Sequence, residues 1–311
     1  MTITQLEYII ALDTHRHFAV AAEHCFVTQP TLSMQIQKLE EELGVKIFDR
    51  TKQPVIPTEI GTGIIAQARR TLREAQMIKQ IISDQKNALS GELRIGIIPT
   101  LAPYVLPPLY KLIRDKYPKL NLVVKEYITE DVIDELKNNR LDCGIIVTPL
   151  NDPSIKEDVL FYEELFVYVS PKNALSDKKY VLAREIDPSQ LWLLEEGHCF
   201  RSQILNLCEL RKSTSFQFKY ETGNIETLKR MVDKSDGITI LPELAVMEFT
   251  KSQLKFVKQL KKPSPAREVS IVTHRDHIKT RLIKTLKEEI LNIVPSQMQK
   301  LQNKKVVEIN Y

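Results

Sequence analysis

The chain has 311 residues, of which 43% are hydrophobic and 27% charged, as expected for a soluble globular protein of two domains. No apolar run approaches the roughly 20 residues of a membrane span, and the N-terminal segment contains Glu7 but no basic stretch, which argues against a secretory signal. The net charge is only +4, and residues 1–90 hold ten basic and ten acidic side chains, so bulk charge does not indicate nucleic acid binding. We expect a cytoplasmic protein, a compartment in which structural disulfides are rare.

Apolar spacing near the N-terminus predicts three short helices, over residues 4–13, 18–25 and 28–44. Thr28 can cap the third helix and Gly44 can end it. Two short helices joined by a brief break form a helix-turn-helix. Residues 45–58 fit a β-hairpin wing, so a winged helix-turn-helix domain is predicted over residues 1–58.

The second helix of such a motif enters the major groove of DNA, with its first residues facing base edges. Glutamine can read adenine, and hydroxyl or cationic side chains can bind phosphate. The candidate DNA contacts are Thr28, Gln29, Pro30, Thr31, Ser33, Gln35, Lys38, Arg50 and Lys52. Spacing alone leaves a second interpretation open, in which the three helices are only a packing module.

Residues 59–88 predict one long helix, with apolar positions at 65, 68, 72, 75, 78 and 82. Pairing with the same helix of a second chain would bury this stripe, and the alternative is packing on its own domain. We therefore expect a linker and dimerisation segment over residues 59–90.

Beyond Ser90-Gly91 the pattern alternates between strand and helix, which predicts an α/β domain with a largely parallel sheet over residues 91–295. Strands are expected over 93–98, 120–127, 143–147, 165–170, 192–194, 237–241 and 269–273. Helices are expected over 105–116, 130–138, 225–234 and 278–293. A second set of strands begins near residue 165, so two subdomains with a cleft between them are predicted. Residues 296–311 read as a polar tail.

Cys199 and Cys208 lie nine residues apart in the segment EEGHCFRSQILNLCEL, which has helical apolar spacing. On an intact helix this separation is roughly 13 Å. A disulfide needs Cα atoms within about 7 Å, so bonding would force the segment to refold. The start of a helix, with His198 and Arg201 close by, is a setting that lowers the pKa of a thiol. Cys208 is expected to face the core.

The other cysteines carry a simpler interpretation. Cys25 and Cys143 lie in apolar surroundings and are expected to be small hydrophobic side chains. A metal site built from His198, Cys199 and Cys208 is the alternative to a redox pair, and it is disfavoured because ligand spacing of the Cys-x-x-Cys kind is missing. No metal or cofactor is expected.

The stretch from Phe18 to Arg50, FAVAAEHCFVTQPTLSMQIQKLEEELGVKIFDR, closely resembles the N-terminal domain of LysR-type transcriptional regulators, and Thr58 and Gly61 continue the pattern. The segments GHCFRSQILNLC, ETLKRMV and GITILPELAV are similar to the peroxide-sensing OxyR branch of that family. The resemblance extends from residue 1 to about residue 293.

This resemblance implies a winged helix-turn-helix, a dimerising linker helix and two α/β subdomains like those of periplasmic binding proteins, with chain crossings near residues 165 and 267. It implies a homodimer or homotetramer on double-stranded promoter DNA, working with RNA polymerase. Hydrogen peroxide would oxidise Cys199, which Cys208 would then capture as a disulfide. The residues implied to bind peroxide or stabilise the thiolate are Thr100, Thr129, His198, Arg201, Gln203 and Arg267.

Two departures from the family pattern concern Met34, where many relatives have arginine, and Ala266, where the branch often has a basic residue that Arg267 would replace. Two other functions are open: a LysR-type regulator that binds a metabolite in the cleft, and a thiol peroxidase that uses the cysteine pair for turnover. The second has no need of a helix-turn-helix.

Overall fold

A computed structural model describes residues 1–84, 89–194, 199–208, 224–277 and 279–307. The chain divides into two compact units, Met1–Asn87 and Ala88–Tyr311. The first unit has one apolar core, and the second unit has two. Within the described ranges, no helix combines the length and the apolar character that crossing a membrane requires.

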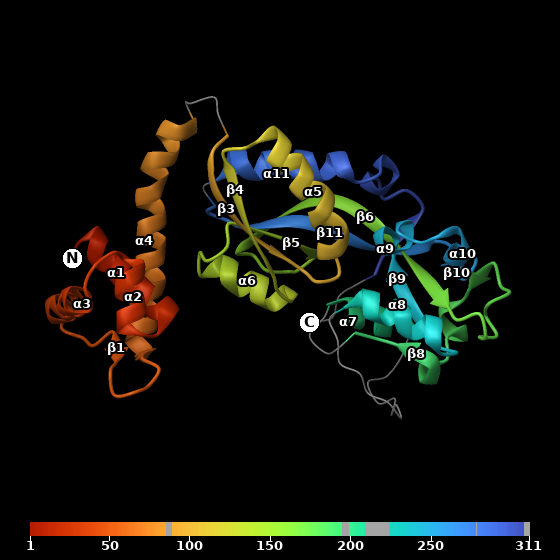
Figure 1. The fold of residues 1–311 in the computed structure, drawn as a ribbon, viewed down its shortest axis with the longest axis horizontal. Coiled ribbons are helices and arrows are strands. Elements are labelled where there is room, and N and C mark those ends of the chain that lie inside the picture. The colour runs from red at the N-terminus through yellow and green to blue at the C-terminus, as the bar shows by residue number, and fades with distance from the viewer. Residues whose placement is uncertain (85–88, 195–198, 209–223, 278, 308–311) are drawn as a thin grey trace. The chain divides into compact units, whose positions relative to one another are not determined.

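The first unit is a helix-turn-helix with a wing. Its elements, in chain order, are α1 (Ile3–His15), α2 (Phe18–His24), α3 (Gln29–Leu43), β1 (Phe48–Asp49), β2 (Ile56–Pro57) and α4 (Glu59–Asp84) (Figure 1). The Thr28 hydroxyl caps α3 by accepting a hydrogen bond from the Thr31 amide, and Gly44 ends it in a left-handed conformation. β1 and β2 pair antiparallel as the wing. The predicted helices and hairpin are confirmed.

Among the side chains of α4 that the structure describes, those in its first half pack on its own unit. Ile65 and Ala68 are buried with the residues of α1, and Leu72 is partly buried against the same core. Ile78, further along the predicted stripe, is 65% exposed. A single helix over residues 59–84 is confirmed, whereas its pairing with a second chain stays a prediction.

The second unit alternates strands and helices around one extended sheet. Its strands are β3 (Gly91–Ile97), β4 (Leu120–Glu126), β5 (Cys143–Thr148), β6 (Ile155–Val169), β7 (Tyr180–Val181), β8 (Leu191–Trp192), β9 (Ile238–Pro242), β10 (Val257–Leu260), β11 (Ser264–His274) and β12 (Lys304–Val306). Its helices are α5 (Ala102–Lys116), α6 (Thr129–Lys137), α7 (Cys199–Leu207), α8 (Ile225–Lys234), α9 (Glu243–Met247), α10 (Lys251–Leu254) and α11 (Thr280–Ile293). Short 3-10 turns occupy Ala183–Glu185, Pro188–Gln190 and Ser296–Gln299.

The sheet is mixed, not largely parallel. β4, β3 and β5 run parallel to one another, but β11 pairs antiparallel with both β5 and β6. β6 also pairs antiparallel with β9 and β10. The prediction of a largely parallel sheet was wrong because it followed from strand-helix alternation, which does not hold between β5 and β6, where no helix intervenes.

One long strand, β6, runs through both halves of this unit. β6 pairs with β11 up to Glu164, and from Leu165 onward it pairs with β9 and β10. One core gathers around β3, β5, α5 and α11, and the other around β9, α7 and α8 (Figure 1). The unit therefore consists of two α/β subdomains, which we call the first and the second subdomain.

The strand predicted over 165–170 begins ten residues earlier, at Ile155. Its first half carries the charged residues Lys156, Glu157 and Asp158 and lies outside the predicted strand. In the fold Lys287 of α11 pairs with Asp158, and the Leu150 amide donates to Glu157. Nothing local in the sequence marks those partners.

The C-terminal segment does not lie outside the fold, as the prediction of a polar tail implied. Met298 is fully buried in the first subdomain core, and β12 pairs in parallel with the start of β11. A few apolar side chains and a row of backbone hydrogen bonds anchor the segment, and such a pattern is too sparse for the sequence alone to reveal.

Candidate redox site and DNA-binding surface

The cysteine pair occupies the two ends of α7. Cys199 is the first residue of that helix, and Cys208 directly follows its last residue with an amide that still donates to the Ile204 carbonyl, at 3.0 Å. Both thiols are free and buried. The helical path places their Cα atoms roughly 13 Å apart, beyond disulfide reach.

The two thiols belong to different cores. Cys199 packs among the buried side chains of the first subdomain, whereas Cys208 packs in the second subdomain with Phe200 and Ile204 of the same helix. Helix α7 therefore joins the cores of both subdomains. A disulfide would require one sulfur to leave the core in which it is packed.

The Cys199 thiol is subject to opposing influences. Burial raises its pKa, while the Thr129 hydroxyl, the Arg267 guanidinium and the first backbone amides of α7 lower it, and burial prevails. This differs from the expectation that the start of a helix and nearby cations would lower the pKa of this thiol. Desolvation in a nearly closed core outweighs them. Burial also raises the pKa of Cys208 to about 12.

A buried ion pair lies beside the Cys199 sulfur. Arg267 of β11 donates from Nε to the Glu163 carboxylate of β6 at 2.7 Å, and both side chains are fully buried. The same guanidinium donates to the Thr100 hydroxyl at 2.8 Å and to the Thr100 carbonyl at 3.2 Å. Its guanidinium carbon also lies 5.1 Å from the ring centre of Phe200. Contacts from distant parts of the chain thus fix this one cation.

Two buried polar atoms have unused hydrogen-bonding capacity. In the described part of the chain, Thr129 Oγ1 and Gln203 Oε1 are the buried side-chain oxygens without a hydrogen-bond partner. Thr129 begins α6 and is close enough to the Cys199 sulfur to lower the pKa of the thiol, although the contact lacks hydrogen-bond geometry. Gln203 lies one helical turn after Cys199, and its amide donates to the Val307 carbonyl at 3.1 Å. Unsatisfied buried atoms beside a thiol are what a small polar ligand could satisfy.

The remaining predicted residues of this site are placed as follows. The Arg201 guanidinium donates to the Leu194 carbonyl at 2.8 Å, and the cation that lowers the pKa of Cys199 is Arg267. Ala266 is buried in β11, next to Arg267. His198 lies outside the described residues. Thr129 and Arg267 therefore lie close to the Cys199 sulfur, Thr100 is bonded to Arg267, and Gln203 lies one turn further along α7. Their roles in chemistry stay predictions.

The other two cysteines lie apart from this site. Burial raises the pKa of both Cys25 and Cys143, and Cys143 is fully enclosed in the first subdomain core. Among the residues that the structure describes, no three histidine, cysteine or acidic side chains are grouped as metal ligands would be.

The candidate DNA-binding residues gather at the start of α3 and on the wing. Thr28, Gln29, Pro30, Lys38 and Lys52 are exposed, whereas Thr31, Ser33 and Gln35 are partly buried. The Gln5 amide donates to Gln35 Oε1 at 3.3 Å, and the Thr28 and Thr31 hydroxyls are hydrogen-bonded at 2.8 Å. Met34 is 48% exposed.

Arg50 is held within its own unit. Its guanidinium donates to the buried Glu40 carboxylate at 3.2 Å and to the Ser33 hydroxyl at 3.3 Å. Glu40 also accepts from the Ile47 and Phe48 amides, at 2.9 and 3.3 Å. This carboxylate fixes the wing on α3, so Arg50 has a structural task besides any phosphate contact.

Three functional-site residues were missed by sequence reasoning. Glu163 and Val307 contact Arg267 and Gln203, each 104 residues away in the chain, and Glu40 contacts the wing, 7 to 10 residues later. The local sequence shows only that each glutamate directly follows an apolar side chain, Tyr162 before Glu163 and Leu39 before Glu40. This is a weak sign that the carboxylate is buried. Val307 acts through its backbone carbonyl, for which a sequence gives no sign.

Comparison with known families assigns both units to one class. Residues 3–62 match the family described as bacterial regulatory helix-turn-helix protein, lysR family, and residues 86–293 match the LysR substrate binding domain. The chain belongs to the LysR family of bacterial regulators, as the fold of a winged helix-turn-helix and two α/β subdomains requires.

Within this family, the chain is similar to regulators whose names refer to hydrogen peroxide or to OxyR. It is 35% identical over 273 residues to the hydrogen peroxide-inducible genes activator of Haemophilus influenzae, covering 88% of this chain and 90% of that protein. It is 36% identical over 272 residues to the transcriptional dual regulator OxyR of Escherichia coli, covering 88% and 89%. The full-length OxyR C199D structure from Pseudomonas aeruginosa matches with a TM-score of 0.82 at 33% identity, covering 97% of this chain and 98% of that one. The family resemblance drawn from the sequence is confirmed.

Proposed function

We propose that this protein is a transcriptional regulator that senses hydrogen peroxide through Cys199 and Cys208. The observation that carries the proposal is the placement of the two thiols, at opposite ends of one helix and in two separate cores. A disulfide between them needs α7 to unfold, so oxidation would convert a chemical event into a change of shape. Similarity to activators named for peroxide-inducible genes supports the same conclusion.

The chemistry takes two steps. The Cys199 thiolate attacks one oxygen of hydrogen peroxide, the O–O bond breaks, and the second oxygen leaves as water after taking a proton, which gives a sulfenic acid at Cys199. The Cys208 sulfur then attacks the Cys199 sulfur, the S–O bond breaks, and the hydroxyl leaves as water with the proton of Cys208. Peroxide is reduced to two waters, and the two thiols are oxidised to one disulfide.

We assign the site residues as follows. Arg267, fixed by Glu163 and Thr100, stabilises the Cys199 thiolate. The open hydrogen-bonding positions of Thr129 and Gln203 receive the peroxide, because both oxygens of that ligand can donate and accept. His198 and Arg201 belong to the same proposal through the family resemblance.

The first unit would bind double-stranded promoter DNA through α3 and the wing, with the exposed Gln29, Lys38 and Lys52 as its main contacts. α4 would join two copies, and a homodimer or homotetramer would engage two half-sites. Contact with RNA polymerase completes the proposal, as activation of transcription requires.

Thiol mapping tests this function directly. Purified full-length chain is treated with a stoichiometric peroxide pulse, digested without reductant and analysed by mass spectrometry, and a DNA footprint is recorded before and after. The expected product is a Cys199–Cys208 disulfide together with an altered footprint. Cys199→Ser should abolish both, whereas Cys143→Ser, which changes a fully buried thiol elsewhere in the core, should retain both. An unchanged footprint after complete oxidation would refute the proposal.

A second function is favoured by one comparison. The chain is also 32% identical over 281 residues to the regulator EstR of Acinetobacter baylyi, whose name does not refer to peroxide. In this alternative a metabolite binds between the subdomains and the cysteines are incidental. A ligand that raises the melting temperature equally in wild type and Cys199→Ser, and that alters the footprint without peroxide, would favour it.

A further inference from the structure

The segment from Asn303 to Val307 is attached to β11 and to β6, the strand that runs through both subdomains. The Ser264 amide donates to the Asn303 carbonyl at 3.2 Å, and the Val307 amide donates to the Ala266 carbonyl at 2.8 Å. Between them, β12 pairs residue by residue with Ser264–Ala266 of β11. Lys304 donates from Nζ to the Tyr162 carbonyl of β6, at 2.8 Å. The segment is therefore held firmly, directly beside Arg267.

Its last described residue contacts the redox helix. The Val307 carbonyl accepts the hydrogen bond of Gln203 Nε2 at 3.1 Å, and the Val307 side chain packs against the core of the second subdomain. Gln203 is fully buried and lies between Cys199 and Cys208 in α7. A backbone carbonyl anchored on β11 thus holds the middle of the helix that has to unfold.

We infer that residues 303–307 form a C-terminal latch that stabilises the reduced form of α7, with Val307 as the positioning residue for Gln203. The inference rests on the proposed function and adds to it. Unfolding α7 removes Gln203 from the Val307 carbonyl, so the latch opposes the step in which Cys208 reaches Cys199. It does not touch the reacting sulfur atoms, and it acts on the second step by stabilising α7.

The latch also limits how Gln203 can serve a ligand. Because its amide nitrogen is occupied by Val307, its free oxygen is fixed in direction and can only accept a hydrogen bond. A peroxide hydroxyl can donate to that oxygen. The latch would therefore determine both the orientation of Gln203 and the stability of the helix that carries it.

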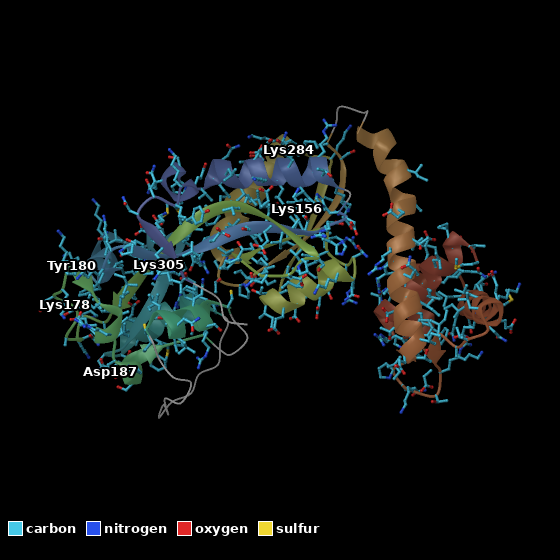
Figure 2. The ribbon with its side chains drawn as sticks, turned by 180° about the vertical axis from the view of Figure 1, so that it is seen from behind. Lys156, Lys178, Tyr180, Asp187, Lys284 and Lys305 are labelled. Atoms are coloured by element: carbon cyan, nitrogen blue, oxygen red, sulfur yellow. The ribbon has the colours of Figure 1, made fainter. Side chains whose placement is uncertain are left out.

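The test separates the two steps of oxidation. Three variants are compared with the wild-type full chain: a chain ending at Gln302, Gln203→Met, and the control Lys305→Ala, whose side chain is exposed on β12 (Figure 2). Sulfenic acid formation is followed by dimedone capture, disulfide formation by quenched thiol mapping, and the Cys199–Cys208 reduction potential by equilibration with glutathione.

We expect the Cys199 sulfenic acid of the truncated chain to convert to the disulfide about fivefold faster than that of wild type, the effect of losing one buried hydrogen bond from the reduced state. Its reduction potential should be more negative, and dimedone capture at Cys199 should be no faster, because the latch also orients Gln203 for the peroxide. Gln203→Met should show the same faster second step, which provides a test if the truncated chain does not fold. Lys305→Ala should behave as wild type.

Rates of the second step and reduction potentials that are the same in the truncated chain, Gln203→Met and wild type would overturn the latch, as would a slower conversion of the sulfenic acid to the disulfide in the truncated chain. A wild-type chain that forms no Cys199–Cys208 disulfide would refute the proposed function itself, and the latch with it. The two failures are therefore distinguishable in the same set of measurements.

Discussion

At the scale of single residues, the site is a thiol in a nearly closed core whose polar neighbours counteract its burial. The pKa of Cys199 is raised, so the thiolate is a minor species near neutral pH and its fraction grows as pH rises. Thr129 and Arg267 limit how far burial raises the pKa of Cys199. Reactivity should therefore depend on these two side chains more than on the start of the helix.

The contribution of Thr129 can be measured apart from peroxide binding. Thr129→Val keeps the volume but removes the hydroxyl that lowers the pKa of Cys199, so alkylation of Cys199 by iodoacetamide should require a higher pH and be slower at pH 7. The measurement is the pH profile of Cys199 modification by mass spectrometry. Thr273→Val, a buried threonine of β11, is the control and should leave the profile in place. An unshifted profile in Thr129→Val would show that the hydroxyl does not act on the thiol.

The Arg267–Glu163 pair should dominate local stability. Arg267→Met leaves a buried carboxylate uncompensated, so the free energy of unfolding should fall by about 3–5 kcal/mol. Arg267→Met/Glu163→Gln removes both charges, keeps an acceptor for the Leu244 amide and should recover most of the loss. Urea unfolding followed by the fluorescence of Trp192, the only tryptophan, reports this unit. Equal losses in the single and double variants would show that charge compensation is not the cause.

At the scale of elements, α7 is a helix with its two ends in different cores. Phe200 and Ile204 anchor it in the second subdomain, while Cys199 anchors its start in the first. Its resistance to unfolding should therefore set how fast the Cys199 sulfenic acid meets Cys208. This dependence can be tested with a substitution that does not touch either thiol.

Ile204→Val removes one buried methylene from α7 and should destabilise the helix by about 0.5–1.5 kcal/mol. Disulfide formation should be about two- to tenfold faster, with unchanged sulfenic acid formation. Ile225→Val, on α8 in the same core, is the matched control, since it lowers stability without loosening α7. Comparable acceleration in both variants would show that global stability, not α7, controls the switch.

Local patterns in the sequence predict the elements of this protein where local chemistry determines them. The caps at Thr28 and Gly44, and the span of α8, follow from neighbouring residues. The first half of β6, the short strands β7 and β10, and β12 were missed because they are stabilised by pairing with distant strands. The two cysteines of the proposed redox pair are visible in the sequence, whereas the side chains around them were expected only from the family resemblance. Glu163 and Val307 were hidden because their roles exist only in three dimensions.

At the scale of the whole molecule, the balanced charge of residues 1–90 has a consequence for DNA binding. The affinity that counterion release provides depends on the number of phosphates that the protein contacts. One subunit offers few free cations on α3 and the wing, because Arg50 is bonded to Glu40. Lys38 and Lys52 are exposed and remain available. Useful affinity should therefore require two or more subunits bound together.

Self-association is the property on which that affinity would depend, and α4 offers a way to break it. Ile78→Lys places a charge on an exposed apolar position of the stripe, so it should dissociate the oligomer into smaller species in sedimentation experiments. Fewer subunits on DNA means fewer phosphates neutralised, so the slope of log affinity against log salt should become shallower, by about 0.9 for each phosphate that is no longer neutralised. Ala66→Lys adds the same charge to an exposed position several turns earlier on α4, which points about a third of a turn around the helix axis from Ile78. This variant should preserve both the oligomer and the slope. If Ile78→Lys left the oligomer intact, α4 beyond Leu72 would not be the pairing surface, and the source of cooperation between subunits would have to lie in the second unit.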